Sequence, residues 1–180
     1  MPPLGDMLWL AGVSVVTDGG MTHQFLADKE SIASERLAVA FLADVLGPHR
    51  DLPVVTWSGE SADCPVLRKA AARCGMADPM EGRWHVDLYR FAERALRLPT
   101  PRLKLKDLAD YFQIPRRDDI ESGTQAVMTF KRLVATSNGQ QRRRLEKQLL
   151  DYNKDDIDVL VGVTDELRIM TAALPPPKFP

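Results

Sequence analysis

The sequence predicts an α/β fold in which a mixed β-sheet is flanked by helices. Two observations carry this prediction. Short apolar and β-branched runs separated by turn residues dominate the first half of the chain, and helical periodicity dominates the second half. The 180 residues suit one domain, which we expect to span residues 1–174, followed by a Pro-rich tail at residues 175–180.

The composition excludes several classes of protein. With 24 basic and 25 acidic residues the formal charge is −1, so the chain is no bulk polycation that coats nucleic acid by charge alone. Its two cysteines, Cys64 and Cys74, have the spacing of neither a disulfide framework nor a zinc site. The apolar run at residues 7–16 is too short to span a bilayer and has no basic flank. We therefore expect a cytoplasmic protein with no membrane partner.

The first elements are a hairpin and a helix. Residues 7–16 predict a strand, Asp18-Gly19-Gly20 predicts a hairpin turn, and residues 22–27 predict the return strand. Helical periodicity follows from Ser31 or Ser34, with Ser34 as a plausible N-cap, and Gly47-Pro48 ends it.

Alternating strands and helices follow. Residues 52–57 predict a buried strand, and the next helix opens near Ser61 or Asp63, has Pro65 in its first turn and ends at Gly75. A further strand is expected at residues 84–88, and helices at residues 89–98, 103–112, 123–135 and 142–170. We expect Trp57, Trp84 and Phe112 to be core residues.

Two acidic positions could carry chemistry. Tyr152 and Asp156 are four residues apart and share one face of the last helix, where a carboxylate beside a phenol can hold a divalent metal and orient a water. Asp63 stands at a helix entrance, at the carboxyl edge of the sheet, where active sites of α/β proteins gather. Each also has a structural interpretation. Asp156 could belong to a solvated acidic helix start, with Asp151, Asp155 and Asp158 on other faces of the helix. Asp63 could be the N-cap of its helix.

Taken together, these two motifs resemble those of the DEDD superfamily of 3′–5′ exonucleases. Tyr152-Asn-Lys-Asp-Asp156 matches the third motif of the tyrosine subclass, and Trp57-Ser-Gly-Glu-Ser-Ala-Asp63 is similar to the second. The resemblance is to the RecB-associated, RNase H-like nuclease modules, and it covers roughly residues 7–168. It implies an RNase H-like mixed sheet. Asp87 resembles an aspartate common in these domains, and we expect its role to be mainly structural.

The chain also departs from that family. Ser58 and Ala62 stand where the second motif usually has Asn and Phe. The first motif, an Asp-x-Glu on the opening central strand, does not precede residues 7–16, so the sheet is expected to lack this strand. Asp6 lies too close to the second strand to replace it.

The resemblance implies metal-dependent 3′–5′ exonuclease activity by a two-metal mechanism with Mg²⁺ or Mn²⁺. Asp63 and Asp156 would bind metal, and Tyr152 would orient the attacking water. Because half of the usual ligands are missing, we expect this chain alone to have little or no activity. The implied partners are single-stranded DNA or RNA and a fused or associated nuclease or helicase domain.

Basic residues between the two motifs could follow a phosphate backbone, although an ordinary solvated helix face explains them equally well. They are Lys104, Lys106, Arg116, Arg117, Lys131, Arg132, Arg142, Arg143 and Arg144.

Two other functions stay open. Residues 105–117 followed by a helix at residues 123–134 could form a helix-turn-helix that binds DNA. The missing first motif would also suit a catalytically inactive RNase H-like scaffold domain.

Overall fold

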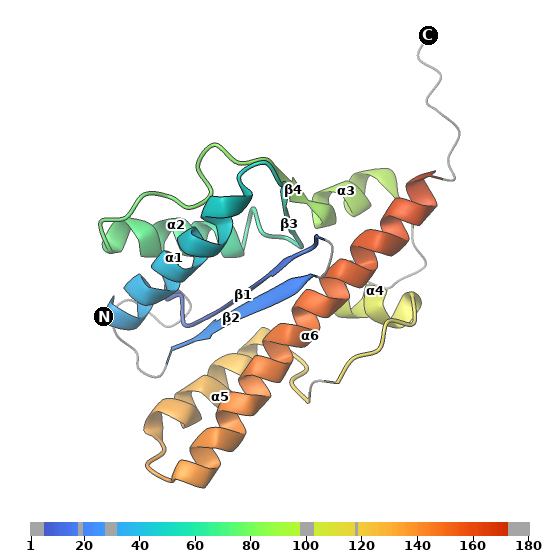
Figure 1. Ribbon diagram of the computed structural model, residues 1–180. Coiled ribbons are helices and arrows are strands. Elements are labelled where there is room, and N and C mark those ends of the chain that lie inside the picture. Colours follow the sequence, from blue (N-terminus) through green and yellow to red (C-terminus); the bar gives the residue numbers. More distant parts are fainter. Residues whose placement is uncertain (1–5, 18–19, 28–31, 98–102, 118, 173–180) are drawn as a thin grey trace.

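The computed structural model describes residues 6–17, 20–27, 32–97, 103–117 and 119–172 (Figure 1). It is an α/β structure with two small sheets and six α-helices. In chain order the elements are β1 (Leu10–Val15), β2 (Met21–Leu26), α1 (Ile32–Leu46), the 3₁₀-helix η2 (Gly47–His49), β3 (Val54–Thr56), α2 (Asp63–Arg73), β4 (His85–Asp87), α3 (Leu88–Ala95), α4 (Leu105–Tyr111), α5 (Gly123–Ala135) and α6 (Gly139–Ala172).

The predicted hairpin is present. β1 and β2 pair antiparallel, with Leu10 opposite Leu26. The N–H of Ala27 donates to the carbonyl of Trp9 at 2.8 Å, which extends the pairing beyond the strands. The turn residues 18 and 19 lie outside the described residues.

The strands form two separate pairs instead of one mixed sheet. β3 and β4 pair parallel, and no ladder joins them to β1 and β2 within the described chain. Trp9 and Ala27 form a hydrogen-bonded pair, and such pairs alternate along an antiparallel ladder. The N–H and C=O groups of the residues between them, Leu10, Gly12 and Ser14, therefore point away from β2. No described strand pairs with this edge of β1.

Helices cover both faces of the β1–β2 pair. In Figure 1, α1 and α2 lie on one side, and α5 and α6 lie on the other. Apolar side chains of α1 and α2 form one core cluster, against which β1 and β3 both pack through Ala11, Val13 and Val54. The two strand pairs therefore share a helical layer although they do not hydrogen-bond to each other.

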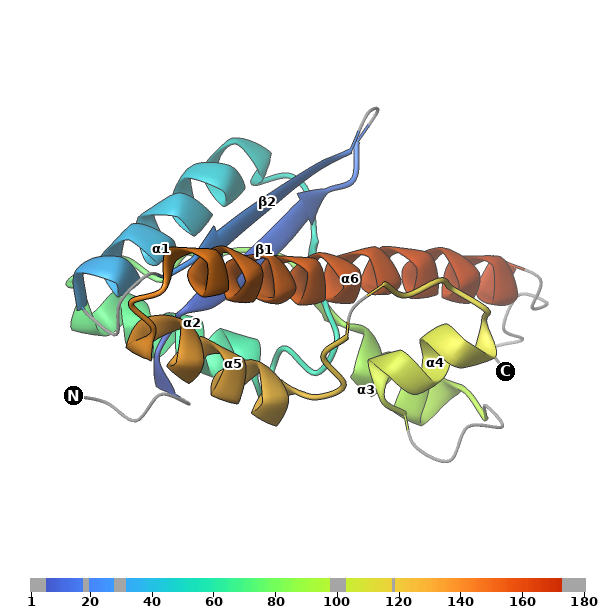
Figure 2. The ribbon, with the colours of Figure 1, turned by 90° about the horizontal axis from the view of Figure 1, so that it is seen from below.

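α6 is the longest element, with 34 residues, and it connects the parts of the molecule. Figure 2 shows α5 beside its N-terminal half and α4 beside its C-terminal half. Near its start, Leu145 and Leu149 pack in a cluster with Phe130 of α5, on which Trp9 stacks at 4.6 Å between ring centroids. This packing of α5, α6 and Trp9 fixes the position of α6 across the hairpin.

Most predicted helix boundaries are confirmed within two or three residues, with one error at a cap. α1 begins at Ile32, so Ser34 lies inside the helix and is not its N-cap. The helix ends at Leu46, as Gly47-Pro48 predicts. α2 ends at Arg73, and Gly75 follows with φ +64°, a conformation that favours glycine.

Two of the three predicted core aromatics are confirmed. Trp57 and Phe112 pack against the cluster formed by α4 and the second half of α6. Trp84 is 82% exposed, so its prediction is wrong. Side chains alternate along a strand, and His85 and Asp87 face α2, which turns Trp84 and Val86 to the opposite face. The predicted tail at residues 175–180 lies outside the described residues.

Candidate active site

The second motif forms a compact loop between β3 and α2. Ser58 adopts φ +58°, and its carbonyl accepts hydrogen bonds from the N–H groups of Ser61 and Ala62. Gly59 packs against Thr56: a Cβ on Gly59 would lie 2.2 Å from the Thr56 hydroxyl oxygen. Any larger residue would therefore displace the turn that leads into α2.

Asp63 is the first residue of α2. Ala62 occupies the N-cap position without a side-chain hydrogen bond, so the interpretation of Asp63 as an N-cap is wrong. Asp63 is exposed to solvent, and the neighbouring protein partly desolvates its carboxyl. This desolvation raises the pKa of its carboxyl, the negative charge of Asp87 raises it further, and His85 lowers it. Asp63 thus offers a solvent-accessible carboxylate in a partly desolvated setting.

Asp87 secures the loop from the end of β4. Its Oδ1 accepts hydrogen bonds from the N–H of Ser58 at 2.9 Å and of Tyr89 at 3.1 Å. Its Oδ2 accepts one from the N–H of Glu60 at 3.0 Å. Only 9% of Asp87 is exposed, and these bonds agree with the mainly structural role predicted from the sequence.

His85 lies on the same side of β4, between β3 and α2. Its Nε2 is 2.8 Å from the Thr56 hydroxyl oxygen and 4.0 Å from the Cys64 sulfur. Burial raises the pKa of the Cys64 thiol, so the neutral thiol is favoured over a reactive thiolate. This group is therefore a packed support for the loop, without an activated nucleophile.

The third motif lies midway along α6. Tyr152 packs against the cluster shared by α5 and α6, and the Lys106 ammonium lies 5.0 Å from the centre of its ring. Asp156 follows one turn later, on the same face of the helix. The neighbouring Asp155 is buried, and its carboxylate accepts a hydrogen bond from the backbone N–H of Arg117. Asp155 is thus buried, whereas Asp156 is half-buried.

The fold brings the two motifs toward the same part of α6. Trp57, which opens the second motif, packs in one cluster with Val159 and Val163. Val159 lies one turn beyond Asp156 on the same helix. The start of the second motif and the second half of α6 therefore share one core cluster.

Carboxylate oxygens suit Mg²⁺ and Mn²⁺ in kind. Within the described ranges, however, no group of three or more His, Cys, Asp or Glu side chains could hold a metal ion. The described donors therefore fit a metal site in type but not in number.

Asp6 is held far from Asp63. Its carboxylate pairs with Lys69 at 3.1 Å, and its carbonyl accepts a hydrogen bond from Arg73 at 2.7 Å. These partners lie six and ten residues beyond Asp63 along α2, or roughly 9 and 15 Å of helix axis. This position agrees with the expectation that Asp6 does not replace the first motif.

Several of the predicted nucleic-acid-binding side chains have intramolecular partners. Lys106 donates to the carbonyl of Ile120 at 2.5 Å, Arg116 pairs with Asp110 at 3.4 Å, and Arg142 pairs with Glu146 at 3.0 Å. The exposed members include Lys104, Arg117, Lys131, Arg132, Arg143 and Arg144. Arg142 precedes Tyr152 by ten residues, or about 15 Å along α6. The members that precede α6 lie at the start of α4, in the segment after it and on α5, so the set comes from several elements.

The helix-turn-helix interpretation does not match the structure. Residues 112–122 separate α4 from α5, far more than the short turn of that motif. The two helices also pack on different segments of α6.

Comparison with known proteins decides the family. The family model of the RNase H superfamily matches residues 2–168. The chain belongs to the RNase H superfamily. No curated protein and no solved structure matches it. For this superfamily member, none of the described helices is long and apolar enough to cross a membrane.

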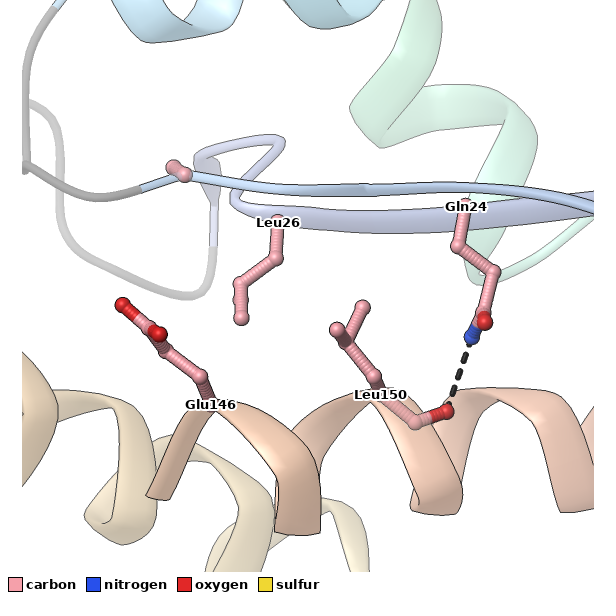
Figure 3. A pocket seen from close by; sticks show the side chains of 5 residues that line it. Gln24, Leu26, Glu146 and Leu150 are labelled. Carbon is pink, nitrogen blue, oxygen red and sulfur yellow. Dashed lines mark hydrogen bonds between the residues drawn. The ribbon is translucent and has the colours of Figure 1, made fainter. Parts of the chain in front are cut away.

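A small open pocket of this RNase H superfamily chain lies beside the start of the third motif. Its lining residues come from β2 and α6 (Figure 3): Gln24, Leu26, Ala27, Glu146 and Leu150. The Gln24 amide nitrogen donates to the Leu150 carbonyl at 2.8 Å and to Asn153 Oδ1 at 2.9 Å. These bonds tie β2 to the helix that carries the third motif.

Sequence reasoning missed two buried polar contacts of the fold. The first is the bond from Arg117 to Asp155, which no spacing rule indicates. The second is Glu35 of α1, a fully buried carboxylate paired with Arg73 of α2 and bonded to the N–H of Leu8 at 3.4 Å. The acidic and basic partners lie far apart in the sequence, so only the tertiary structure identifies them.

Proposed function

We propose that this chain is a metal-dependent 3′–5′ exonuclease-like domain of the tyrosine subclass, acting on single-stranded DNA or RNA. The observation that carries the proposal is the packing of Trp57 against the core cluster that contains Val159 and Val163, which supports convergence of the second and third motifs. Asp63 and Asp156 are the proposed metal ligands. The Tyr152 hydroxyl is proposed to orient the attacking water.

Mg²⁺ or Mn²⁺ would supply charge stabilisation at the phosphodiester and activation of the water. The chain's own residues position the groups: the loop at residues 57–62 presents Asp63, and α6 presents Tyr152 and Asp156. The exposed cations along α6 are proposed to bind phosphates of the substrate strand. A cytoplasmic location and a neighbouring nuclease or helicase domain belong to the same proposal.

The missing ligands define the activity expected. The proposed two-metal reaction needs more carboxylates than Asp63 and Asp156, and the unpaired edge of β1 is where an added central strand would bind. We therefore propose that residues 1–180 alone have little or no nuclease activity, and that an upstream strand with Asp-x-Glu restores it.

The test is a gel assay with Mg²⁺ or Mn²⁺ on 3′- and 5′-labelled single-stranded DNA and RNA. It compares residues 1–180 with a chain extended upstream by an Asp-x-Glu strand. We expect chelator-sensitive degradation from the 3′ end by the extended chain, abolished by Asp156→Asn. Robust degradation by the short chain, lost on Asp63→Ala, would contradict the need for the added strand. No cleavage by either chain would favour the inactive scaffold.

A further inference from the structure

Trp84 is the most exposed large apolar side chain in the described ranges, with 82% of its surface accessible. Tryptophan is highly buried on average in folded proteins, and neither the fold nor the proposed cleavage site accounts for this exposure. Val86, two residues further along β4, is 40% exposed and lies on the same face of the strand. The outward face of β4 thus presents a flat ring beside an apolar neighbour.

The backbone that carries this ring is held on both sides. The Trp84 carbonyl accepts a hydrogen bond from the N–H of Val54 at 2.7 Å, where the pairing of β3 with β4 begins. The preceding Arg83 donates from Nε to the Pro79 carbonyl at 2.8 Å and from Nη1 to the His49 carbonyl at 3.4 Å. An aromatic side chain on such a rigid strand loses little conformational entropy on binding, because only its two χ angles are left to be fixed.

Cationic side chains follow the ring along the chain. β4 continues directly into α3 (Figure 1), which buries Leu88 and Ala92 and leaves Arg90 and Arg94 exposed, one turn apart. Asp87 ends β4 three residues after Trp84, so the helix with these arginines begins about 10 Å beyond the ring. Residues 83–97 contain four arginines and two acidic residues, a net charge of +2 in a chain whose formal charge is −1.

The nearby acidic side chains leave this charge available. Arg90 pairs with Glu60 at 3.0 Å, but both side chains are about half exposed, so a phosphate can compete for the guanidinium. Glu93 accepts a hydrogen bond from the Tyr89 hydroxyl at 3.1 Å. Arg94 is therefore an exposed cation on the outer side of α3.

A ring followed by cations selects the chemistry of the ligand. Every base of a nucleic acid has a face that stacks on an aromatic side chain, and its phosphates bind arginine. A duplex keeps its bases stacked on one another, whereas a single strand leaves them free. A protein partner fits less well, because the centre of a protein–protein interface is depleted in charged residues.

We propose that Trp84 is a stacking platform for a base of single-stranded nucleic acid, and that Arg90 and Arg94 bind phosphates of the same strand. This inference rests on the proposed function only in taking single-stranded nucleic acid as the ligand. It involves neither a metal ion nor Asp63, and it holds whether or not the strand is cleaved.

The experiment measures binding to the 180-residue chain by fluorescence anisotropy, with a chelator present so that no strand is cut. The probes are a labelled thymidine strand of about 16 nucleotides and an abasic strand of equal length, which has phosphates but no bases. We expect Trp84→Leu to weaken binding of the thymidine strand at least about fivefold and to leave the abasic strand nearly unchanged. Arg94→Ala should weaken binding of both strands and lower the slope of log K against log salt by about 0.7.

Tryptophan emission gives a second readout. Trp9 stacks on Phe130 and Trp57 packs against the core, so the thymidine strand should quench Trp84 selectively. Trp84→Phe keeps a ring, and we expect a smaller loss of affinity than in Trp84→Leu together with loss of the quenching. Tyr111→Leu removes another exposed ring, 44% accessible at the end of α4, and should change neither readout. Circular dichroism checks that each variant is folded.

Unchanged affinity of Trp84→Leu for the thymidine strand overturns the platform. An equal loss for the abasic strand also overturns it, because the ring would then not act through a base. If the unmodified chain binds neither strand, the inference is wrong and the exposed face of β4 is left for a protein partner. Cleavage by the upstream-extended chain that Trp84→Leu does not alter would contradict the platform alone, whereas Trp84-dependent binding without any cleavage would contradict the exonuclease alone.

Discussion

Gly12 of β1 lies directly against Asn153 of α6: a Cβ on Gly12 would stand 2.2 Å from Asn153 Oδ1 and 2.5 Å from Ile157 Cδ1. Asn153 belongs to the third motif, between Tyr152 and Asp156. The close approach at Gly12 therefore sets the distance between β1 and the third motif on α6.

The change Gly12→Ala tests this contact. We expect it to lower the free energy of unfolding by about 1–3 kcal/mol, since an added methyl must displace the Asn153 and Ile157 side chains packed between β1 and α6. Urea denaturation followed by circular dichroism measures it. Gly139→Ala, at the start of α6 where nothing lies within 4 Å of an added Cβ, should not destabilise the chain. Equal effects of the two changes would contradict a tight approach at Gly12.

The pair of Glu35 and Arg73 gives a second prediction. Arg73→Met leaves the fully buried Glu35 carboxylate without its cation, and we expect a loss of about 3 kcal/mol in the free energy of unfolding. Arg68→Met, on the same helix, breaks a surface pair with Asp78 and should cost far less. Thermal and urea unfolding measure the loss in the free energy of unfolding for each of the two variants. If Arg73→Met is no worse than Arg68→Met, the buried pair does not stabilise the fold.

Asp63 should make stability depend on pH. Burial and Asp87 raise the pKa of its carboxyl in the folded state, so the folded state binds the proton more tightly than the unfolded chain. Ionisation then opposes folding above the ordinary Asp pKa of about 3.9, and the penalty is complete above the raised value.

Asp63→Asn removes that penalty, so we expect it to stabilise the chain at pH 7 and to lose this gain toward pH 3. Unfolding free energies of the variant and of the unmodified chain, measured across this range, test the sign. Asp51→Asn, at an exposed turn, is the control. A stabilisation that grows on acidification would mean that the environment favours the charged carboxylate.

Arg143 tests the proposed path of the nucleic acid. It is exposed on the first half of α6, and we expect Arg143→Glu to weaken binding of single-stranded DNA several-fold and to reduce the slope of log K against log salt by about 1. Fluorescence anisotropy at several salt concentrations measures both. Arg36→Glu, exposed on α1 across the sheet, makes the same charge change and should leave binding nearly unaltered. Equal losses would indicate a response to net charge alone.

The sequence by itself determined the elements and their order. Alternation and turn residues located the hairpin, Gly47-Pro48 marked the end of α1, and α5 has the predicted bounds. These signals are local, because a turn, a cap or a period depends on residues within a few positions of one another. The spacing of Tyr152 and Asp156 on one helical face is of the same kind.

Only the tertiary structure decided what surrounds those residues. The exposure of Trp84, the bond of Asp155 to Arg117, the burial of Glu35 and the three donors on Asp87 all depend on contacts between segments distant in the chain. The same holds for the separation of the strands into two pairs, since hydrogen bonding between strands depends on which edges the packed helices bring together. Local patterns specify which residues can form a strand or a helix, whereas packing selects the partners.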